Sequence, residues 1–161
     1  MREADEHLKQ WFRAFPRLSL CRGNHDRLVD RKSRTSGLPD RVFRPFRDIW
    51  GLPKDWVDDF NFQVDGVLYT HGTGLNGKFA HMKAAEQNRQ STVIGHVHSW
   101  GGQTGYSASE KDRIFGMNVG SGLDRKAYAF EYGRDFTRKP MIGCGIVTDK
   151  GKYCQFFPME I

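Results

Sequence analysis

Three apolar stretches of this chain each run into a short loop that contains a glycine and a histidine, and this repeated pattern strongly constrains the fold. The stretches are LSLC before Gly23-Asn24-His25-Asp26, VLYT before His71-Gly72, and TVI before Gly95-His96-Val97-His98. Short apolar runs that stop at a glycine predict buried strands. Open α/β sheets form their ligand sites outside the carboxyl ends of their strands, so the three loops are expected to meet in one crevice.

The residues in these loops are suited to binding a metal. Imidazole nitrogens and amide oxygens are ligands for zinc, manganese or iron. A single histidine in such a loop is more often structural, but three loops of this kind after three strands favour a shared metal site. The alternative is that these histidines occupy unrelated core and surface positions.

The rest of the chain predicts a mixture of helices and strands. Leu8, Trp11, Phe12 and Phe15 recur at the spacing of one buried helical face, which predicts a helix over residues 3–15. Further predicted elements are a strand over 17–22, a short helix over 46–50, a hairpin turning at Asp65-Gly66, a helix over 77–90, strands over 91–96 and 113–122, and a hairpin turning at 149–151. Residues 30–59 are otherwise predicted to be rich in loops. This order indicates an α/β or α+β fold.

Composition places the chain among folded proteins. Its 161 residues are 38% hydrophobic and 13% aromatic, which fits a single domain over residues 1–161. No apolar run reaches membrane-spanning length, so we expect no membrane partner. Three cysteines without a CxxC spacing favour reduced thiols, and we therefore expect a cytoplasmic protein.

The positive charge is concentrated in one segment. The formal net charge is +6, and residues 27–47 contain seven arginines and lysines but only Asp30 and Asp40 as acids. Such a segment either contacts phosphate groups or is simply a solvated loop. The balance permits binding to nucleic acid without showing it.

The ordered motifs GNHD, HG and GHVH resemble those of the calcineurin-like metallophosphoesterases. Residues 118–122, Asn-Val-Gly-Ser-Gly, are similar to the strand exit that often follows the last of these motifs in that family. The resemblance extends from the first predicted helix to the final hairpin. It implies an α/β fold built as part of a four-layer α/β/β/α sandwich, with mixed sheets between helices.

The resemblance also implies roles for individual residues. The family holds two metals about 3.5–4 Å apart and uses a bridging hydroxide to attack phosphorus. By resemblance, His25 stabilises the phosphoryl transition state and protonates the leaving oxygen, and Asp26 orients His25. Arg27, the first residue of the basic segment, is a candidate substrate contact. The implied metal ligands are Asn24, His71 and His96 for one ion and His98 for the other. Manganese is the expected metal, with iron, zinc and nickel as alternatives.

Two motifs that precede GNHD in the family have no counterpart here. No Gly-Asp dipeptide occurs in the chain, so the carboxylate that bridges the two metals has no matching position. Asp5-Glu6-His7 fits the other motif, Asp-x-His, but it begins an amphipathic helix and is interpreted as helix surface. We therefore expect the chain to begin after these motifs, with a two-metal centre that is incomplete within the chain.

The motifs present and the motifs missing lead to two candidate functions. The first is a metal-dependent phosphoesterase that hydrolyses phosphomonoesters or phosphodiesters, with nucleotides or nucleic acid as candidate substrates. The alternative is a catalytically inactive or partner-dependent binding or assembly subunit derived from the same family. Loss of the opening strands would expose a sheet edge, so a second chain that completes the sheet, or a homo-oligomer, is an expected partner.

Overall fold

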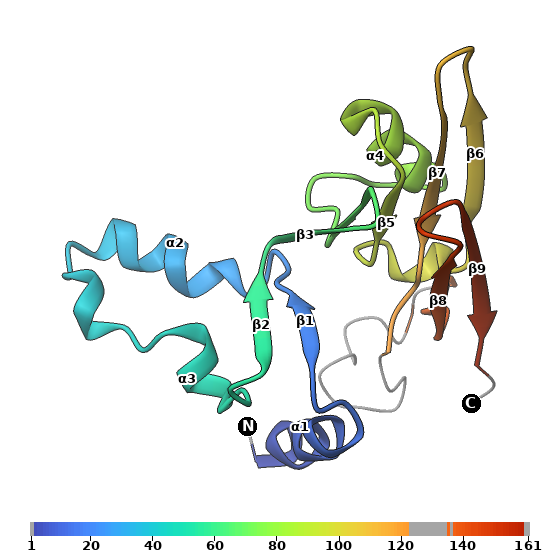
Figure 1. The fold of residues 1–161 in the computed structure, drawn as a ribbon. Coiled ribbons are helices and arrows are strands. Elements are labelled where there is room, and N and C mark those ends of the chain that lie inside the picture. The colour runs from blue at the N-terminus through green and yellow to red at the C-terminus, as the bar shows by residue number, and fades with distance from the viewer. Residues whose placement is uncertain (1, 123–134, 136, 160–161) are drawn as a thin grey trace. The chain divides into compact units, whose positions relative to one another are not determined.

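The chain forms a mixed α/β structure (Figure 1). The computed structural model describes residues 2–122, 135 and 137–159. It divides into two compact units, Met1–Phe60 and Asn61–Ile161. The prediction of a single domain over the whole chain stays a prediction, and each unit is described by itself below.

The first unit combines a short parallel sheet with helices. Its elements are α1 (Arg2–Ala14), β1 (Leu18–Cys21), α2 (Arg27–Ser36), η1 (Asp40–Val42), α3 (Phe46–Trp50) and β2 (Trp56–Asp59). Strands β1 and β2 pair in parallel, with Leu18 opposite Trp56 and Cys21 opposite Asp59. The helices over 3–15 and 46–50 and the first strand are confirmed. The prediction that 30–59 is otherwise loop is wrong for α2 and β2.

Trp56 is the main core side chain of this unit. It is 2% exposed, its indole Nε1 donates a 2.7 Å hydrogen bond to the Phe15 carbonyl, and the Phe12 ring meets it edge-on at 5.0 Å. These contacts fix the end of α1 against β2. The predicted buried face of α1 is only partly correct, because Trp11 and Phe15 remain 53% and 46% exposed.

The second unit is built on a five-stranded sheet. Its strands are β3 (Asn61–Val64), β4 (Val67–Thr70), β5 (Thr92–Ile94), β6 (Thr104–Ala108) and β7 (Arg113–Asn118). The order across the sheet is β3-β4-β5-β7-β6, with β4, β5 and β7 parallel and the two outer strands antiparallel to their neighbours. The predicted hairpin turn is confirmed: Asp65 and Gly66 have φ of 51° and 73°, as a tight turn of the I′ kind requires.

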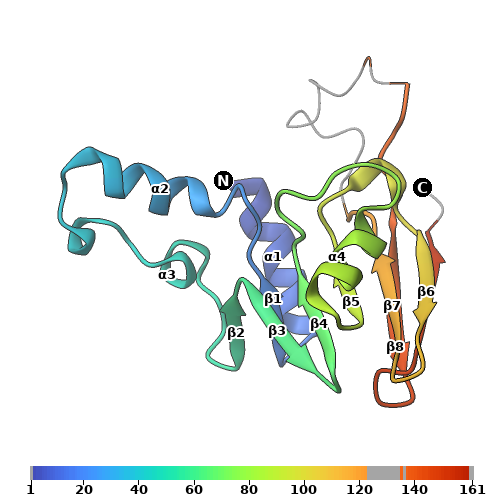
Figure 2. The same cartoon turned by 90° about the horizontal axis from the view of Figure 1, so that it is seen from above.

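A helix and a second small sheet cover the two faces of this sheet (Figure 2). The remaining elements are α4 (Ala80–Asn88), η2 (His98–Trp100), β8 (Gly143–Thr148) and β9 (Tyr153–Pro158). Ile94 packs with Ala80 and Ala84 of α4, whereas Val93 and Met117 pack toward the β8–β9 hairpin. Successive residues of a strand point to opposite faces, so this alternation produces two separate apolar cores.

Two glycines allow α4 to lie directly on the sheet. Gly105 of β6 and Gly116 of β7 are cross-strand partners. A β-carbon at Gly116 would stand 2.3 Å from the His81 carbonyl oxygen, and one at Gly105 would stand 2.7 Å from the Met82 sulfur. His81 is 3% exposed, and this burial lowers the pKa of its imidazole, which favours the neutral ring. His81 is therefore part of the packing between α4 and the sheet.

None of the helices over the described residues combines the length and the apolar character that crossing a bilayer requires.

Candidate metal site

The candidate site lies where three parallel strands of the second unit end. Thr70, Ile94 and Asn118 are aligned across β4, β5 and β7. The residues that follow them therefore leave the sheet at the same edge. Two of the three histidine motifs begin here, one after β4 and one after β5, as the sequence predicted.

His71 and His96 face each other across this edge. Nδ1 of His96 stands 2.9 Å from Nε2 of His71, and the two rings are 4.8 Å apart and inclined by 69°. The backbone supports the pair, since the Gly95 N–H donates to the His71 carbonyl at 3.3 Å. The tautomer of the two rings decides which nitrogen donates its N–H and which accepts.

The spacing of these nitrogens suits two ligands of one metal ion. Nitrogens bound at about 2.0–2.1 Å and at a right angle to each other stand about 2.9 Å apart. The observed separation of Nδ1 and Nε2 is 2.9 Å, and both atoms are imidazole nitrogens of the kind that zinc, manganese and iron accept. The pair therefore fits two neighbouring ligands at a right angle, as in an octahedral set, rather than two ligands of a tetrahedral zinc site.

Gly72 leaves the space that the pair needs. Its φ is +85°, a conformation that side chains rarely adopt, and a β-carbon there would lie 3.0 Å from Cβ of Ile94 and 3.5 Å from Cβ of His96. The glycine after His71 thus lets the two loops approach closely.

His98 belongs to the same loop system. It opens η2, is half-buried, and its carbonyl accepts a 2.9 Å hydrogen bond from the Met141 N–H. The backbone of this loop is thereby held at two points, at His98 and at the end of β5.

Asn118 has a role in this region that the sequence did not reveal, since the sequence marked it only as the first residue of the strand exit. It is 1% exposed, and its side-chain nitrogen donates to the carbonyls of Val97 and Trp100 at 2.8 and 3.1 Å. Its side-chain oxygen accepts from the Gly120 N–H at 3.3 Å. One amide therefore ties the GHVH loop to the end of β7. A polar residue at the end of an apolar strand was the signal that could have found it.

Replacing Asn118 by aspartate is expected to destabilise the fold by about 2–4 kcal/mol at neutral pH, because it removes two donated bonds and buries a carboxylate against two carbonyls. Burial raises the pKa of such a carboxyl group, so the loss should shrink as the pH falls and the group takes up a proton. Urea unfolding at several pH values measures this. Asn61→Asp, at an exposed position in β3, is the matched control. Equal stability of the two variants would contradict the assigned role.

The GNHD motif forms a tight turn in the first unit, after β1. The Asp26 carboxylate accepts a 2.7 Å hydrogen bond from the Gly23 N–H, and the Leu28 N–H donates to the His25 carbonyl at 3.0 Å. Asn24 is half-buried and His25 is exposed. Asp26 thus closes the turn through its bond to the Gly23 N–H. Its role in orienting His25 stays a prediction.

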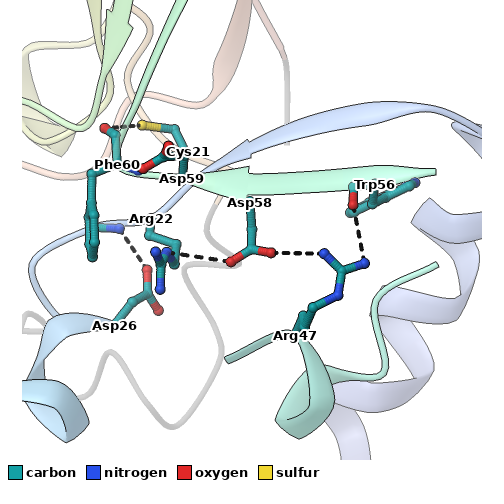
Figure 3. A network of polar contacts seen from close by, with 9 residues as sticks. Cys21, Arg22, Asp26, Arg47, Trp56, Asp58, Asp59 and Phe60 are labelled. Atoms are coloured by element: carbon teal, nitrogen blue, oxygen red, sulfur yellow. Dashed lines mark hydrogen bonds and ion pairs between the residues drawn. The ribbon is translucent and has the colours of Figure 1, made fainter. Parts of the chain in front are cut away.

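Arg22 and Arg27 lie beside this turn and stack on the ring of Phe60. Figure 3 shows Arg22 with its partner Asp58, which Arg47 also contacts. The guanidinium carbons of Arg22 and Arg27 lie 4.2 and 3.8 Å from the centre of the Phe60 ring. Arg22 also pairs with Asp58 at 3.5 Å, and Arg47 reaches the same carboxylate at 3.2 Å. Arg27 is exposed, and the Phe60 ring holds it beside the GNHD turn.

Only some of the predicted site residues contact each other in the part of the chain that the structure describes. His71 and His96 contact each other in the second unit, while Asn24, His25 and Asp26 share one turn of the first. Over the described residues, no group of three or more histidine, cysteine, aspartate or glutamate side chains is arranged to hold a metal. The meeting of all three motifs in one crevice stays a prediction. His7 is exposed on α1, in line with its interpretation as helix surface.

Comparison with known proteins adds no relative to this picture: no protein-family model, curated protein or solved structure matches the chain.

Proposed function

We propose that this chain is a metal-dependent phosphoesterase domain of the calcineurin-like kind. The observation that carries the proposal is the His71–His96 pair, whose facing nitrogens stand 2.9 Å apart at the edge where three parallel strands end. The other support is the ordered resemblance of GNHD, HG and GHVH to the family's motifs.

Each residue then has a distinct task. His71 and His96 would hold a divalent metal together with Asn24, and His98 would serve a second ion. A bound divalent metal supplies an acidified water and neutralises charge on the phosphoryl oxygens. His25 would donate a hydrogen bond to the phosphoryl group and a proton to the leaving oxygen.

The finer parts of the proposal follow from the resemblance. We propose manganese as the metal, with iron, zinc or nickel as alternatives, and a two-metal centre that lacks its bridging carboxylate within this chain. The helix, sheet and hairpin layers of the second unit are compatible with part of a four-layer sandwich. We propose phosphomonoesters or phosphodiesters as substrates and the cytoplasm as the location.

A binding or assembly subunit that needs a partner is the second candidate. The first unit favours it, because Val57 of the two-stranded sheet and Leu28 and Val29 of α2 are 57%, 39% and 45% exposed. Apolar side chains of this kind are stabilised when another surface covers them. That surface would come from a second polypeptide or from another copy of the chain.

The test combines metal content with turnover. The purified chain is loaded with manganese and dialysed, and its metal is counted by elemental analysis. Hydrolysis of bis(p-nitrophenyl) phosphate is then followed with and without EDTA. The phosphoesterase proposal expects bound manganese and turnover that EDTA abolishes.

His96→Ala is expected to lose both the metal and the turnover, because it removes one of the two facing nitrogens. His7→Ala changes an exposed histidine of α1 and serves as the control. A wild-type chain that binds manganese but has no turnover would favour the binding subunit. A chain that neither binds manganese nor hydrolyses the ester would contradict the phosphoesterase proposal.

A further inference from the structure

Nearly all of the net positive charge lies in one short segment. Residues 27–47 carry seven basic and two acidic residues, so they account for five of the chain's six net charges. The rest of the chain together has a net charge close to zero. The charge is therefore a local feature of α2 and the segment that follows it.

Within α2 the arginines form a stripe. Arg27, Arg31 and Arg34 are spaced at i, i+4 and i+7, which places them on one face of the helix. All three are exposed. The stripe is about 10 Å long at the usual rise of an α-helix.

Among the residues that the structure describes, no carboxylate neutralises this stripe. In the described part of the chain, no ion pair includes Arg27, Arg31 or Arg34, and Asp30 on the same helix forms none with Arg34. By contrast, Asp58 engages Arg22 and Arg47 at 3.5 and 3.2 Å. The first unit thus pairs Arg22 and Arg47 with an acid, whereas no described carboxylate pairs with this row, which suits it to an outside anion.

The stripe begins at the candidate catalytic turn. Arg27 follows Asp26 directly, and its guanidinium is stacked on Phe60 at 3.8 Å. A stacked guanidinium loses less conformational freedom when it binds phosphate. From this point the stripe runs along α2 away from the turn.

We propose that the Arg27–Arg31–Arg34 stripe binds the sugar-phosphate backbone of a nucleic acid and leads it to the GNHD turn. One strand of a duplex presents a phosphate about every 3.4 Å along the axis, so a stripe of about 10 Å matches about three phosphates. A mononucleotide or a small phosphoester offers too few phosphates to use the row. The inference rests on the proposed function for the reaction, but binding to the stripe needs no metal.

The experiment measures binding alone. A fluorescein-labelled double-stranded DNA oligonucleotide is titrated with the chain in EDTA, and anisotropy is read between about 50 and about 200 mM salt. The wild-type chain is expected to bind with a strong salt dependence. Arg31→Gln/Arg34→Gln should weaken binding about 10-fold or more at low salt and lower the slope of log affinity against log salt by about 1.8.

A matched double variant separates the stripe from general charge. Arg13→Gln/Arg17→Gln removes two exposed arginines of the same unit and changes the net charge equally. It should leave the salt slope unchanged, and circular dichroism verifies that both variants are folded. Equal weakening by both pairs, or no binding by the wild-type chain, would overturn the proposal.

Vesicles of phosphatidylcholine with phosphatidylserine test the alternative that the stripe binds an anionic membrane surface. Tighter binding to these vesicles than to the oligonucleotide, lost in Arg31→Gln/Arg34→Gln, would overturn the nucleic-acid proposal in favour of a membrane surface. Because every binding assay contains EDTA, a failure here does not affect the phosphoesterase proposal, and failure of manganese-dependent turnover does not affect the binding result.

Discussion

Gly116→Ala is expected to destabilise the second unit by about 3 kcal/mol or more, at the upper end of the cost of overpacking a core. The added β-carbon would stand 2.3 Å from the His81 carbonyl oxygen, 2.5 Å from its carbonyl carbon and 2.9 Å from the Met82 nitrogen. These are backbone atoms of α4, so no side-chain rotation relieves the clash. The helix must move off the sheet, and urea unfolding measures the loss.

Alanine substitutions at two other glycines serve as controls for Gly116→Ala. Gly122→Ala adds a β-carbon with nothing within 4 Å and should change stability little. Gly105→Ala meets the end of the Met82 side chain, at 2.7 Å from its sulfur, and methionine adapts easily. It should fall between the other two. A Gly116→Ala chain as stable as Gly122→Ala would mean that α4 does not lie on β7 as described.

Local signals in the sequence were sufficient for several elements. Asp65-Gly66 predicted its hairpin because both positions must adopt positive φ, and few residue pairs do so readily. The motifs at His71 and His96 were predicted at strand ends because an apolar run stopped at a polar loop. Since β4 and β5 are parallel neighbours, these two ends had to share an edge.

Other elements depend on contacts that no local pattern contains. Strand β2 has the sequence Trp-Val-Asp-Asp, which lacks the usual signature of a strand. It forms because it pairs with β1 and because Trp56 is held by α1. Helix α2 was missed for a related reason: its sequence is rich in charge and leaves only Ser33 buried, so it has no apolar periodicity.

The candidate site shows the same division. Residue types and order predicted His71 and His96 correctly as neighbours, because two parallel strands determine where they lie. The role of Asn118 was not visible, since it depends on carbonyls at Val97 and Trp100 that come near only when the GHVH loop folds back over β7. The sequence thus predicts which residues are candidate metal ligands. It does not predict which residues position them, because that depends on tertiary contacts.

His25→Ala tests whether the proposed metal can be bound while the proposed turnover is lost. If His25 donates to the phosphoryl group and its leaving oxygen, the change should lower turnover of bis(p-nitrophenyl) phosphate about 100- to 10,000-fold, the usual contribution of a positioned acid or base. Manganese content should stay at the wild-type value, because the facing nitrogens belong to His71 and His96. Elemental analysis and steady-state kinetics on one preparation give both quantities.

His96→Ala is the variant with which His25→Ala is compared. His96→Ala should lose metal and turnover together, whereas His25→Ala should lose turnover alone. His25 is exposed and its turn is closed by backbone and Asp26 contacts, so its side chain can be removed without unfolding the turn. If His25→Ala retains full turnover, as expected for His7→Ala, the role assigned by resemblance to His25 is wrong. The proposed metal site at His71 and His96 would then have to act with a proton donor from another part of the chain or from a partner.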